Sequence, residues 1–248
     1  MSLDRFINLD LLVAYGPRML DGLLVTLELV SLSIVLGALL ALPIAFARMS
    51  RFAPVRWLAF AYVYALRGTP LLAQTFLVYY GAGQFRAELQ AVGLWWFFRE
   101  AFLCCVLTFT LNTAAYQAEI YRGAIMAVAR GQTEAALSLG LRGGQAFRLV
   151  VLPQAFIIAL RPLGNEIILM IKGSSVAAIV TVFDLMGVTR LAFARSFDMQ
   201  VYLWAAVLYL ALVETLRRLW DALELRLTRH LRMRPVPKST PRATGVPS

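Results

Sequence analysis

The sequence predicts an all-α integral membrane protein with five transmembrane helices. Three observations support this: 60% of the 248 residues are hydrophobic, only 15% are Asp, Glu, Lys or Arg, and several apolar runs are long enough to cross a bilayer. A soluble domain typically has about 25% charged and about 45–50% apolar residues. The composition therefore excludes the disordered, collagen-like, disulfide-rich and ordinary cytosolic classes.

Each expected span is an apolar run of roughly 20 residues, the length needed to cross the hydrocarbon core. The runs are Leu23–Ala47, Trp57–Tyr80, Glu100–Ile120, Leu149–Ile171 and Met199–Thr215. The run Val176–Phe183 is too short to span and is expected to cap the outer end as an interfacial or re-entrant piece. A cleaved signal peptide is the alternative for the first run. The segment before that run has no net positive charge, and the run is too long for an h-region, so we keep it as a span.

Two of the expected spans contain polar interruptions. Arg67-Gly68-Thr69-Pro70 breaks the second run, and Arg161, Pro162, Asn165 and Glu166 lie inside the fourth. Ionisable groups at bilayer depth cost about 2.5–3.5 kcal/mol each on insertion scales, and they usually face a cavity or a partner. These residues are therefore candidates for a transport pathway or for structural pairing.

The distribution of arginine predicts the orientation of the chain. The formal net charge is +10, from 24 Lys and Arg against 14 Asp and Glu. Loops left in the cytoplasm are enriched in Lys and Arg. Arginine-rich segments follow the first, third and fifth runs, and the other connections are balanced in charge. The N-terminus is therefore expected outside and the C-terminus in the cytoplasm.

The expected organisation is one membrane domain with two terminal segments. Residues 1–22 form an N-terminal periplasmic segment, and residues 23–220 form the transmembrane domain, with a long cytoplasmic loop at about 122–148. Residues 221–248 form a cytoplasmic tail, whose end from Arg234 is rich in Pro, Ser and Thr and is expected to be disordered. The sequence shows no internal repeat, so any symmetry must come from a second chain.

The long cytoplasmic loop contains a predicted short helix. Thr133 is placed to cap its start and Glu134 to lie in its first turn, where the helix dipole favours an anion. Gly140 and Gly143-Gly144 allow sharp turns, and a second helix is expected to begin near Gln145 and to enter the membrane. Such a helix suits docking in a groove of a partner, or lying on the membrane surface. Composition alone does not separate these two alternatives.

The order of motifs adds a family resemblance. Glu134-Ala135-Ala136, Gly140, Val150 and Leu152-Pro153 resemble the EAA loop of binding-protein-dependent ABC importer permeases, with Val150 where Ile is usual. The segments around Arg67–Pro70, Thr108–Tyr116, Ala118–Ile125 and Asn165–Met170 resemble the polar amino-acid branch of that family. The likeness is to the M-type permease of the histidine/lysine/arginine/ornithine and octopine systems, and it covers residues from about 26 to 231.

The resemblance implies a type I ABC importer permease fold in a bacterial inner membrane. It implies a half-transporter that pairs with a homologous Q-type permease, two copies of an ATPase and a periplasmic binding protein, working by alternating access. The chain has no G-x-x-x-x-G-K-[ST] loop, so ATP and Mg²⁺ would be bound by the partner ATPase, and no cofactor or metal site is expected here. The residues expected to couple to the ATPase are Glu134, Ala135, Ala136, Gly140, Leu152 and Pro153. Glu134 would pair with a basic group of the ATPase or stabilise the helix start.

Five polar residues are candidates for the substrate pathway: Glu166, Asn165, Arg161, Arg67 and Asn112. A carboxylate at the depth of Glu166 would suit a cationic amino acid. The alternative is an internal ion pair with Arg161 or Arg67, although Arg161 lies five residues away and on a different side of one helix. Arg67 would mark a bend or contact a substrate carboxylate. Asn112 and Thr113 would line the same interface or hold helices together.

These expectations favour a permease for basic amino acids or opines. Within the family, the rival is a permease for a neutral or acidic polar amino acid. A rival from another class is a secondary carrier that uses Glu166 as a proton or sodium site. A purely structural membrane scaffold would leave Arg67, Arg161 and Glu166 unexplained.

Overall fold

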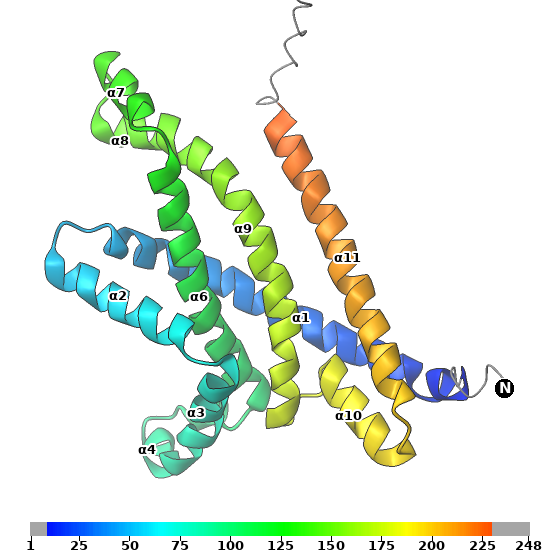
Figure 1. The fold of residues 1–248 in the computed structure, drawn as a ribbon. Helices are drawn as coiled ribbons and strands as arrows, with labels where there is room; N and C mark the ends of the chain where they lie inside the picture. Colours follow the sequence, from blue (N-terminus) through cyan, green and yellow to red (C-terminus); the bar gives the residue numbers. More distant parts are fainter. Residues whose placement is uncertain (1–8, 230–248) are drawn as a thin grey trace, which may run out of the picture.

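Helices account for all regular secondary structure of the computed structural model, which describes residues 9–229 (Figure 1). The all-α prediction is confirmed. The elements are α1 (Leu9–Arg48), α2 (Ala53–Gly68), α3 (Leu71–Gln84), α4 (Arg86–Ala91), α5 (Trp95–Phe98), α6 (Ala101–Ala127), α7 (Arg130–Ser138), α8 (Gly143–Ala146), a π-helical turn (Phe147–Val151), α9 (Leu152–Gly173), a 3₁₀ segment (Ser174–Val180), α10 (Leu185–Ser196) and α11 (Gln200–Thr228). The C-terminal end that is expected to be disordered lies outside the described residues.

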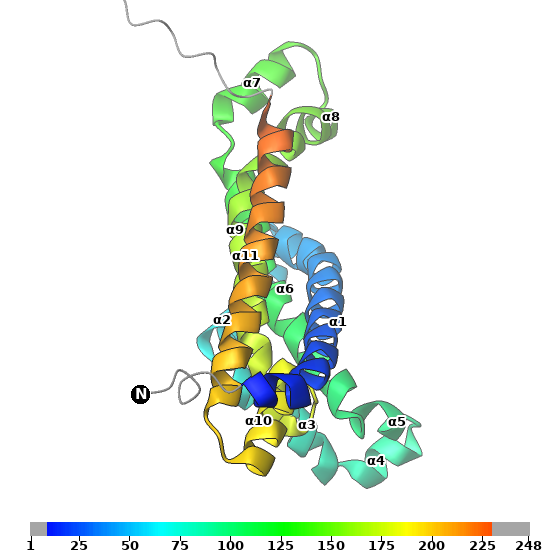
Figure 2. The same cartoon turned by 90° about the vertical axis from the view of Figure 1, so that its right-hand side faces the viewer.

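Helices α6 and α9 form the middle of the molecule. Helix α1 crosses behind them and also contacts α2, α10 and α11, and α11 packs along α9 (Figure 1). Helices α7 and α8 project at one end, whereas α3, α4, α5 and α10 gather at the other, and the view turned by 90° agrees (Figure 2). The polar segment α7–α8 is thus held between two long apolar helices and outside the main bundle.

Three helical segments are long and apolar enough to cross a membrane by length and composition: Leu11–Arg48, Ala101–Ala127 and Gly143–Val180. They correspond to the first, third and fourth expected spans. The second expected span is divided into two shorter helices, α2 and α3, at Thr69. The fifth corresponds to α11, whose second half carries Glu214 and several arginines.

Helix α1 begins at Leu9, much earlier than the apolar run that starts at Leu23. The charges of Asp10, Arg18 and Asp21 end the apolar run in the sequence, but the helix continues through them. Met19, 1% exposed, packs with Leu185 and Ala205. Tertiary packing against α10 and α11 therefore extends the helix beyond its apolar part.

Two glycines set close helix crossings. A Cβ atom at Gly37 of α1 would overlap the methyl group of Thr113 on α6, and a Cβ at Gly164 of α9 would overlap the indole of Trp220 on α11. The Trp220 Nε1–H donates to the Leu160 carbonyl at 2.9 Å. These crossings bring the polar residues of α6, α9 and α11 near one another.

Candidate functional site

The projecting helix α7 ends in a turn built on Gly140. Gly140 has φ +85°, a left-handed conformation that suits glycine. Its N–H donates to the Leu137 carbonyl at 2.9 Å, and the Leu141 N–H donates to the Ala136 carbonyl at 3.2 Å. This pair of hydrogen bonds is the Schellman arrangement that closes a helix C-terminus. The sharp turn expected at Gly140 is therefore present.

The start of α7 differs from the expectation. The helix begins at Arg130, and its N-cap residue is Ala129, which makes no side-chain capping hydrogen bond. Thr133 therefore lies inside the helix and does not cap it, and Glu134 follows it beyond the first turn. The prediction was wrong because a helix can begin without a side-chain cap when its first N–H groups stay accessible to water.

The surface of α7 is suited to contact a partner. Glu134 and Ala135 are exposed, and Glu134 makes no ion pair or hydrogen bond through its side chain within residues 9–229. Leu137 and Leu139 are 47% and 84% exposed, respectively, whereas Ala136 is buried. A pocket of about 560 Å³ lies between α7, α8, the end of α6 and the π-helical turn, and Arg130, Glu134 and Phe147 are among the residues that line it.

The second helix of the loop enters the membrane domain through a π-helical turn. The Arg142 N–H donates to the side-chain oxygen of Gln145 at 2.9 Å, which starts α8. The Leu152 N–H donates to the Phe147 carbonyl, five residues back, so the backbone widens before α9. Pro153, which has no backbone N–H to donate, lies in the first turn of α9, directly after the π-helical turn.

The break between α2 and α3 is stabilised by amide side chains. Pro70 cannot donate to the Leu66 carbonyl, and Thr69 before it is extended, with φ −116° and ψ 146°. The freed carbonyl accepts hydrogen bonds from Gln74 Nε2 at 2.8 Å and from Asn112 Nδ2 at 3.2 Å. Asn112 also donates to Gln74 Oε1 at 2.9 Å. Asn112 thus joins α6 to the bend, as polar groups at membrane depth do when neighbours satisfy a broken helix.

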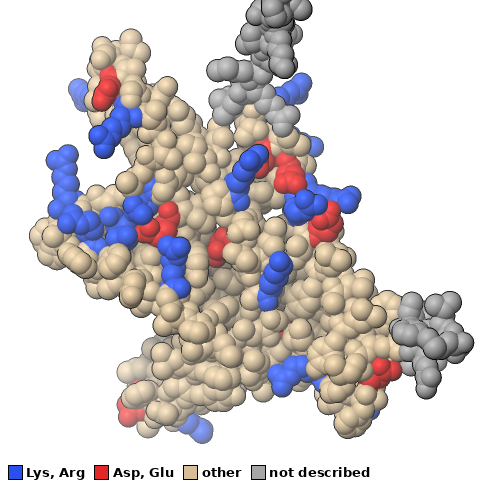
Figure 3. Space-filling model, viewed as in Figure 1, with Lys and Arg blue, Asp and Glu red and all other residues tan. Residues whose placement is uncertain are grey.

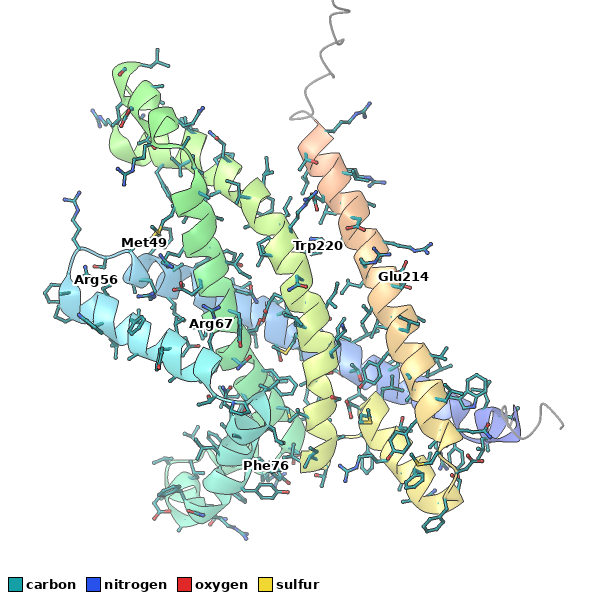
Figure 4. All side chains as sticks on the ribbon, viewed as in Figure 1. Met49, Arg56, Arg67, Phe76, Glu214 and Trp220 are labelled. Carbon is teal, nitrogen blue, oxygen red and sulfur yellow. The ribbon has the colours of Figure 1, made fainter. Side chains whose placement is uncertain are left out.

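Arg67 is exposed at the same break. Its guanidinium lies 5.0 Å from the ring centre of Tyr116 on α6. It lines a pocket of about 400 Å³ together with Arg48 and Glu119. Glu119 binds Arg48 at 2.8 Å and Arg122 at 2.7 Å, so this pocket has more positive than negative charge. Figure 4 shows Arg67 beside α6.

Glu166 lies inside the interface of α6 and α9. It is 6% exposed, and its Oε1 accepts a hydrogen bond from the Thr113 hydroxyl at 2.9 Å. Gln117 Nε2 donates to the same hydroxyl at 3.1 Å and to the Ile34 carbonyl of α1 at 3.2 Å. Neither Arg161 nor Arg67 forms an ion pair with Glu166 among the described residues. A buried polar chain therefore links three helices.

A polar groove of about 260 Å³ separates α9 from α11. Asn165, Arg161 and Trp220 line it. Arg161 Nε binds Glu224 Oε1 at 2.7 Å, and the Arg161 side chain is 83% exposed while that of Glu224 is 18% exposed. Figure 4 shows Trp220 on the side of α11 that faces α9. An exposed ion pair on a helix that spans the membrane requires water or a partner beside it.

The five candidate residues therefore occupy three places. Arg161 and Asn165 share the α9–α11 groove, Arg67 and Asn112 lie at the break between α2 and α3, and Glu166 is buried between α6 and α9. Three residues that hold these places together were not predicted from the sequence: Gln74, Gln117 and Trp220. Buried amides inside apolar runs are the signal that could have identified the first two.

The comparisons with known proteins agree with this arrangement. Residues 33–229 match the family described as "Binding-protein-dependent transport system inner membrane component". The chain is 39% identical over 228 residues to the nopaline transport system permease protein NocM of Agrobacterium fabrum, covering 92% of this chain and 95% of that protein. It is 38% identical over 210 residues to the octopine transport system permease protein OccM of Rhizobium radiobacter, covering 84% and 85%.

A solved structure shares the fold. It is described as "Crystal structure of an amino acid ABC transporter with histidines", and one of its chains is 35% identical to this one, with a TM-score of 0.77 over 87% of this chain and 96% of that chain. Long apolar helices, a broken second span and a projecting helical loop define a membrane permease of the type I importer fold. The chain belongs to the family of binding-protein-dependent transport system inner membrane components. The resemblance to permeases of polar amino-acid ABC importers is confirmed.

Proposed function

We propose that this chain is the permease subunit of an ATP-driven importer for basic amino acids or opines, working by alternating access. The observation that carries the proposal is α7, an exposed helix between α6 and α9 that projects at one end of the molecule (Figures 1 and 2). Through α8 and the π-helical turn, α7 is continuous with α9, which carries Arg161, Asn165 and Glu166. A movement of α7 would therefore be transmitted to α9 and to these three polar residues.

The proposed partners are those that the family implies, and the exposed surface of α7 supports the contact with the ATPase. One of the two ATPase subunits, which bind ATP and Mg²⁺, would receive the segment Glu134–Gly140, and the exposed Glu134 carboxylate would meet a basic group there. Leu152-Pro153 would anchor the segment to α9. A homologous Q-type permease would complete the pathway, and a periplasmic binding protein would deliver the substrate. No cofactor or metal in this chain is part of the proposal.

The proposed orientation places α7 and the C-terminal end of α11 in the cytoplasm. Charged side chains gather over the half of the molecule that contains α7, and a largely uncharged belt lies below them (Figure 3). Arg130, Arg142 and Arg148 belong to the projecting end. An arginine-rich end beside an uncharged belt supports the positive-inside orientation of the expected domains, with residues 1–22 outside and 221–248 inside.

The substrate proposal rests on the polar residues and on the relatives. The nopaline and octopine permeases, whose names specify opines, are each more than a third identical to this chain. Arg161 and Asn165 are exposed in the α9–α11 groove and Arg67 is exposed at the break, so these three side chains can meet a substrate directly. Glu166 reaches a substrate only if α6 and α9 separate, because Thr113 now holds its carboxylate.

The test is uptake by proteoliposomes that contain this chain, its permease partner, the ATPase and the binding protein. Labelled arginine, histidine, an opine and glutamine are offered with and without ATP. We expect ATP-dependent uptake of the cationic substrate or the opine. Preferred uptake of glutamine would overturn the substrate proposal but keep the transporter. Uptake that persists without ATP and follows an ion gradient would replace the proposal with a secondary carrier.

The Glu166→Gln variant separates the two roles of this residue. Glutamine keeps an oxygen that accepts the Thr113 hydrogen bond but removes the charge. Lost uptake of cations with intact assembly would support a direct electrostatic role of Glu166. Unchanged uptake would assign Glu166 to the helix interface, with Arg161, Asn165 and Arg67 left as the substrate contacts.

A further inference from the structure

An apolar groove lies between α1, α6 and α9, away from the polar groove between α9 and α11. The transport proposal does not use it. It is formed by the C-terminal part of α1, the C-terminal part of α6 and the first half of α9, and its volume is about 270 Å³. Ala124, Ala155 and Ala159, each no more than 4% exposed, form a floor of small side chains. Leu42, Phe46 and Phe156, each between 47% and 53% exposed, form the walls. We call this the alanine groove.

The alanine groove is apolar along its length and ends near a free cation. On α9 its lining residues follow one face at helical spacing: Leu152, Ala155, Phe156, Ala159 and Leu163. Arg148 lies one turn before Leu152 on that face. It is exposed and makes no side-chain hydrogen bond or ion pair with residues 9–229. The neighbouring ring of Phe147 packs against Phe46 at 6.1 Å between centroids, so the start of α9 is held against the end of α1 at this mouth.

These dimensions match one leaflet of a bilayer. From Leu152 to Leu163, the part of α9 that lines the groove, the helix rises by about 17 Å, at about 1.5 Å per residue. One leaflet of the hydrocarbon core is about 15 Å thick, half of about 30 Å. A lipid whose acyl chain lies in the alanine groove from Leu163 to Leu152 would therefore have its phosphate beside Arg148, one turn before Leu152. Anionic lipids of the cytoplasmic leaflet attract Lys and Arg at this level.

We propose that the alanine groove binds one anionic phospholipid of the cytoplasmic leaflet, with its acyl chain over Ala155 and Ala159 and its phosphate at Arg148. The inference rests on the orientation proposed above for naming the leaflet, but not on the substrate. Because the groove joins α1, α6 and α9 directly below the loop that carries α7, a bound lipid would hold the start of α9 in place. It would therefore couple lipid composition to the movement of α7.

The first experiment measures bound lipid on the purified transporter complex by native mass spectrometry. Phosphatidylglycerol and phosphatidylethanolamine with identical acyl chains are supplied in turn. We expect phosphatidylglycerol to be retained on each copy of this chain, and Arg148→Gln to weaken that retention about fivefold, the effect of one cation at an anionic surface. Arg142→Gln, which removes another exposed arginine of the same loop, is the matched control and should retain the lipid.

A second pair of variants tests the acyl-chain site. Leu42→Trp fills the groove from an exposed wall position, and Leu36→Trp adds the same bulk to α1 outside the groove. We expect the first variant to lose the bound lipid and the second to keep it. Equal retention by all variants, or no preference for phosphatidylglycerol, would overturn the proposal whether or not uptake assays support the importer.

A cysteine placed in the groove distinguishes lipid from a protein partner. Phe156→Cys is tested for disulfide formation with cysteines on the partner permease; Cys104 and Cys105 are fully buried and give little background. Efficient cross-linking would show that a helix of the partner fills the groove, and the lipid proposal would fail. Labelling of Phe156→Cys by a membrane-soluble maleimide, reduced by added phosphatidylglycerol, is the expected result.

Discussion

Gly164 of α9 lies directly against the indole of Trp220 of α11, and no side chain larger than hydrogen fits between them. The indole N–H donates to the Leu160 carbonyl, one turn before Gly164 on α9. This contact sets the distance between the helices that border the groove containing Arg161 and Asn165. The geometry of the polar groove therefore depends on one glycine and one tryptophan that no charge pattern identifies.

We expect Gly164→Ala to destabilise the folded complex by about 1–3 kcal/mol, the usual cost of overpacking a tight contact. The added methyl group would displace Trp220 and break its hydrogen bond, and thermal unfolding of the purified complex measures the loss. Gly123→Ala is the control, because a Cβ atom at Gly123 of α6 meets nothing within 4 Å. Equal melting temperatures for both variants would contradict the proposed close contact.

We expect Thr113→Val to destabilise the protein by about 1–3 kcal/mol, since it leaves the buried Glu166 carboxylate without its hydroxyl donor. Thr110→Val is the control on the same helix, because the buried Thr110 hydroxyl has no hydrogen-bond partner among the described residues. That change should be neutral or stabilising. Denaturation of both variants in the same detergent makes the comparison, and an equal loss would argue against the Thr113–Glu166 bond.

We expect Gly140→Ala to weaken coupling between ATP hydrolysis and transport. An alanine at φ +85° is strained by about 1–2 kcal/mol, so the turn after α7 would relax and change the direction of Leu139. Gly131→Ala, in an open position within α7, should keep or improve coupling. The ratio of substrate transported to ATP hydrolysed is measured for each variant. An unchanged ratio in Gly140→Ala would show that this turn does not set the docking geometry.

We expect Gln74→Leu to cost about 1–3 kcal/mol, because Leu66 and Thr69 lose a donor at the break between α2 and α3. The freed segment would become more susceptible to proteolysis near Gly68 and Thr69. Gln90→Leu, at an exposed site of α4, is the control for replacing an amide by leucine. Protease cutting at the same rate in both variants would show that the amide does not stabilise the break.

The covalent sequence determined the elements whose signals are local. The apolar runs predicted the long helices, Pro70 predicted the break between α2 and α3, and Gly140 predicted the turn after α7. Each of these features depends either on the backbone conformation of one residue or on the transfer of an apolar run into lipid. The order of the motifs in the loop identified the family of permeases that the chain resembles. The start of α7 was missed because its N-cap residue is Ala129, which carries no recognisable capping signal.

Tertiary structure decided which polar groups meet. Glu166 pairs with Thr113 and Arg161 pairs with Glu224, partners that lie 53 and 63 residues away in the chain. Helix α1 continues before Leu23 because Met19 packs in a buried site with Leu185 of α10 and Ala205 of α11. Helical periodicity predicts which residues share one face of a helix. Which other helix packs against that face depends on how the helices cross. Those crossings are fixed by close contacts such as Gly37 with Thr113, which form only when the whole bundle packs.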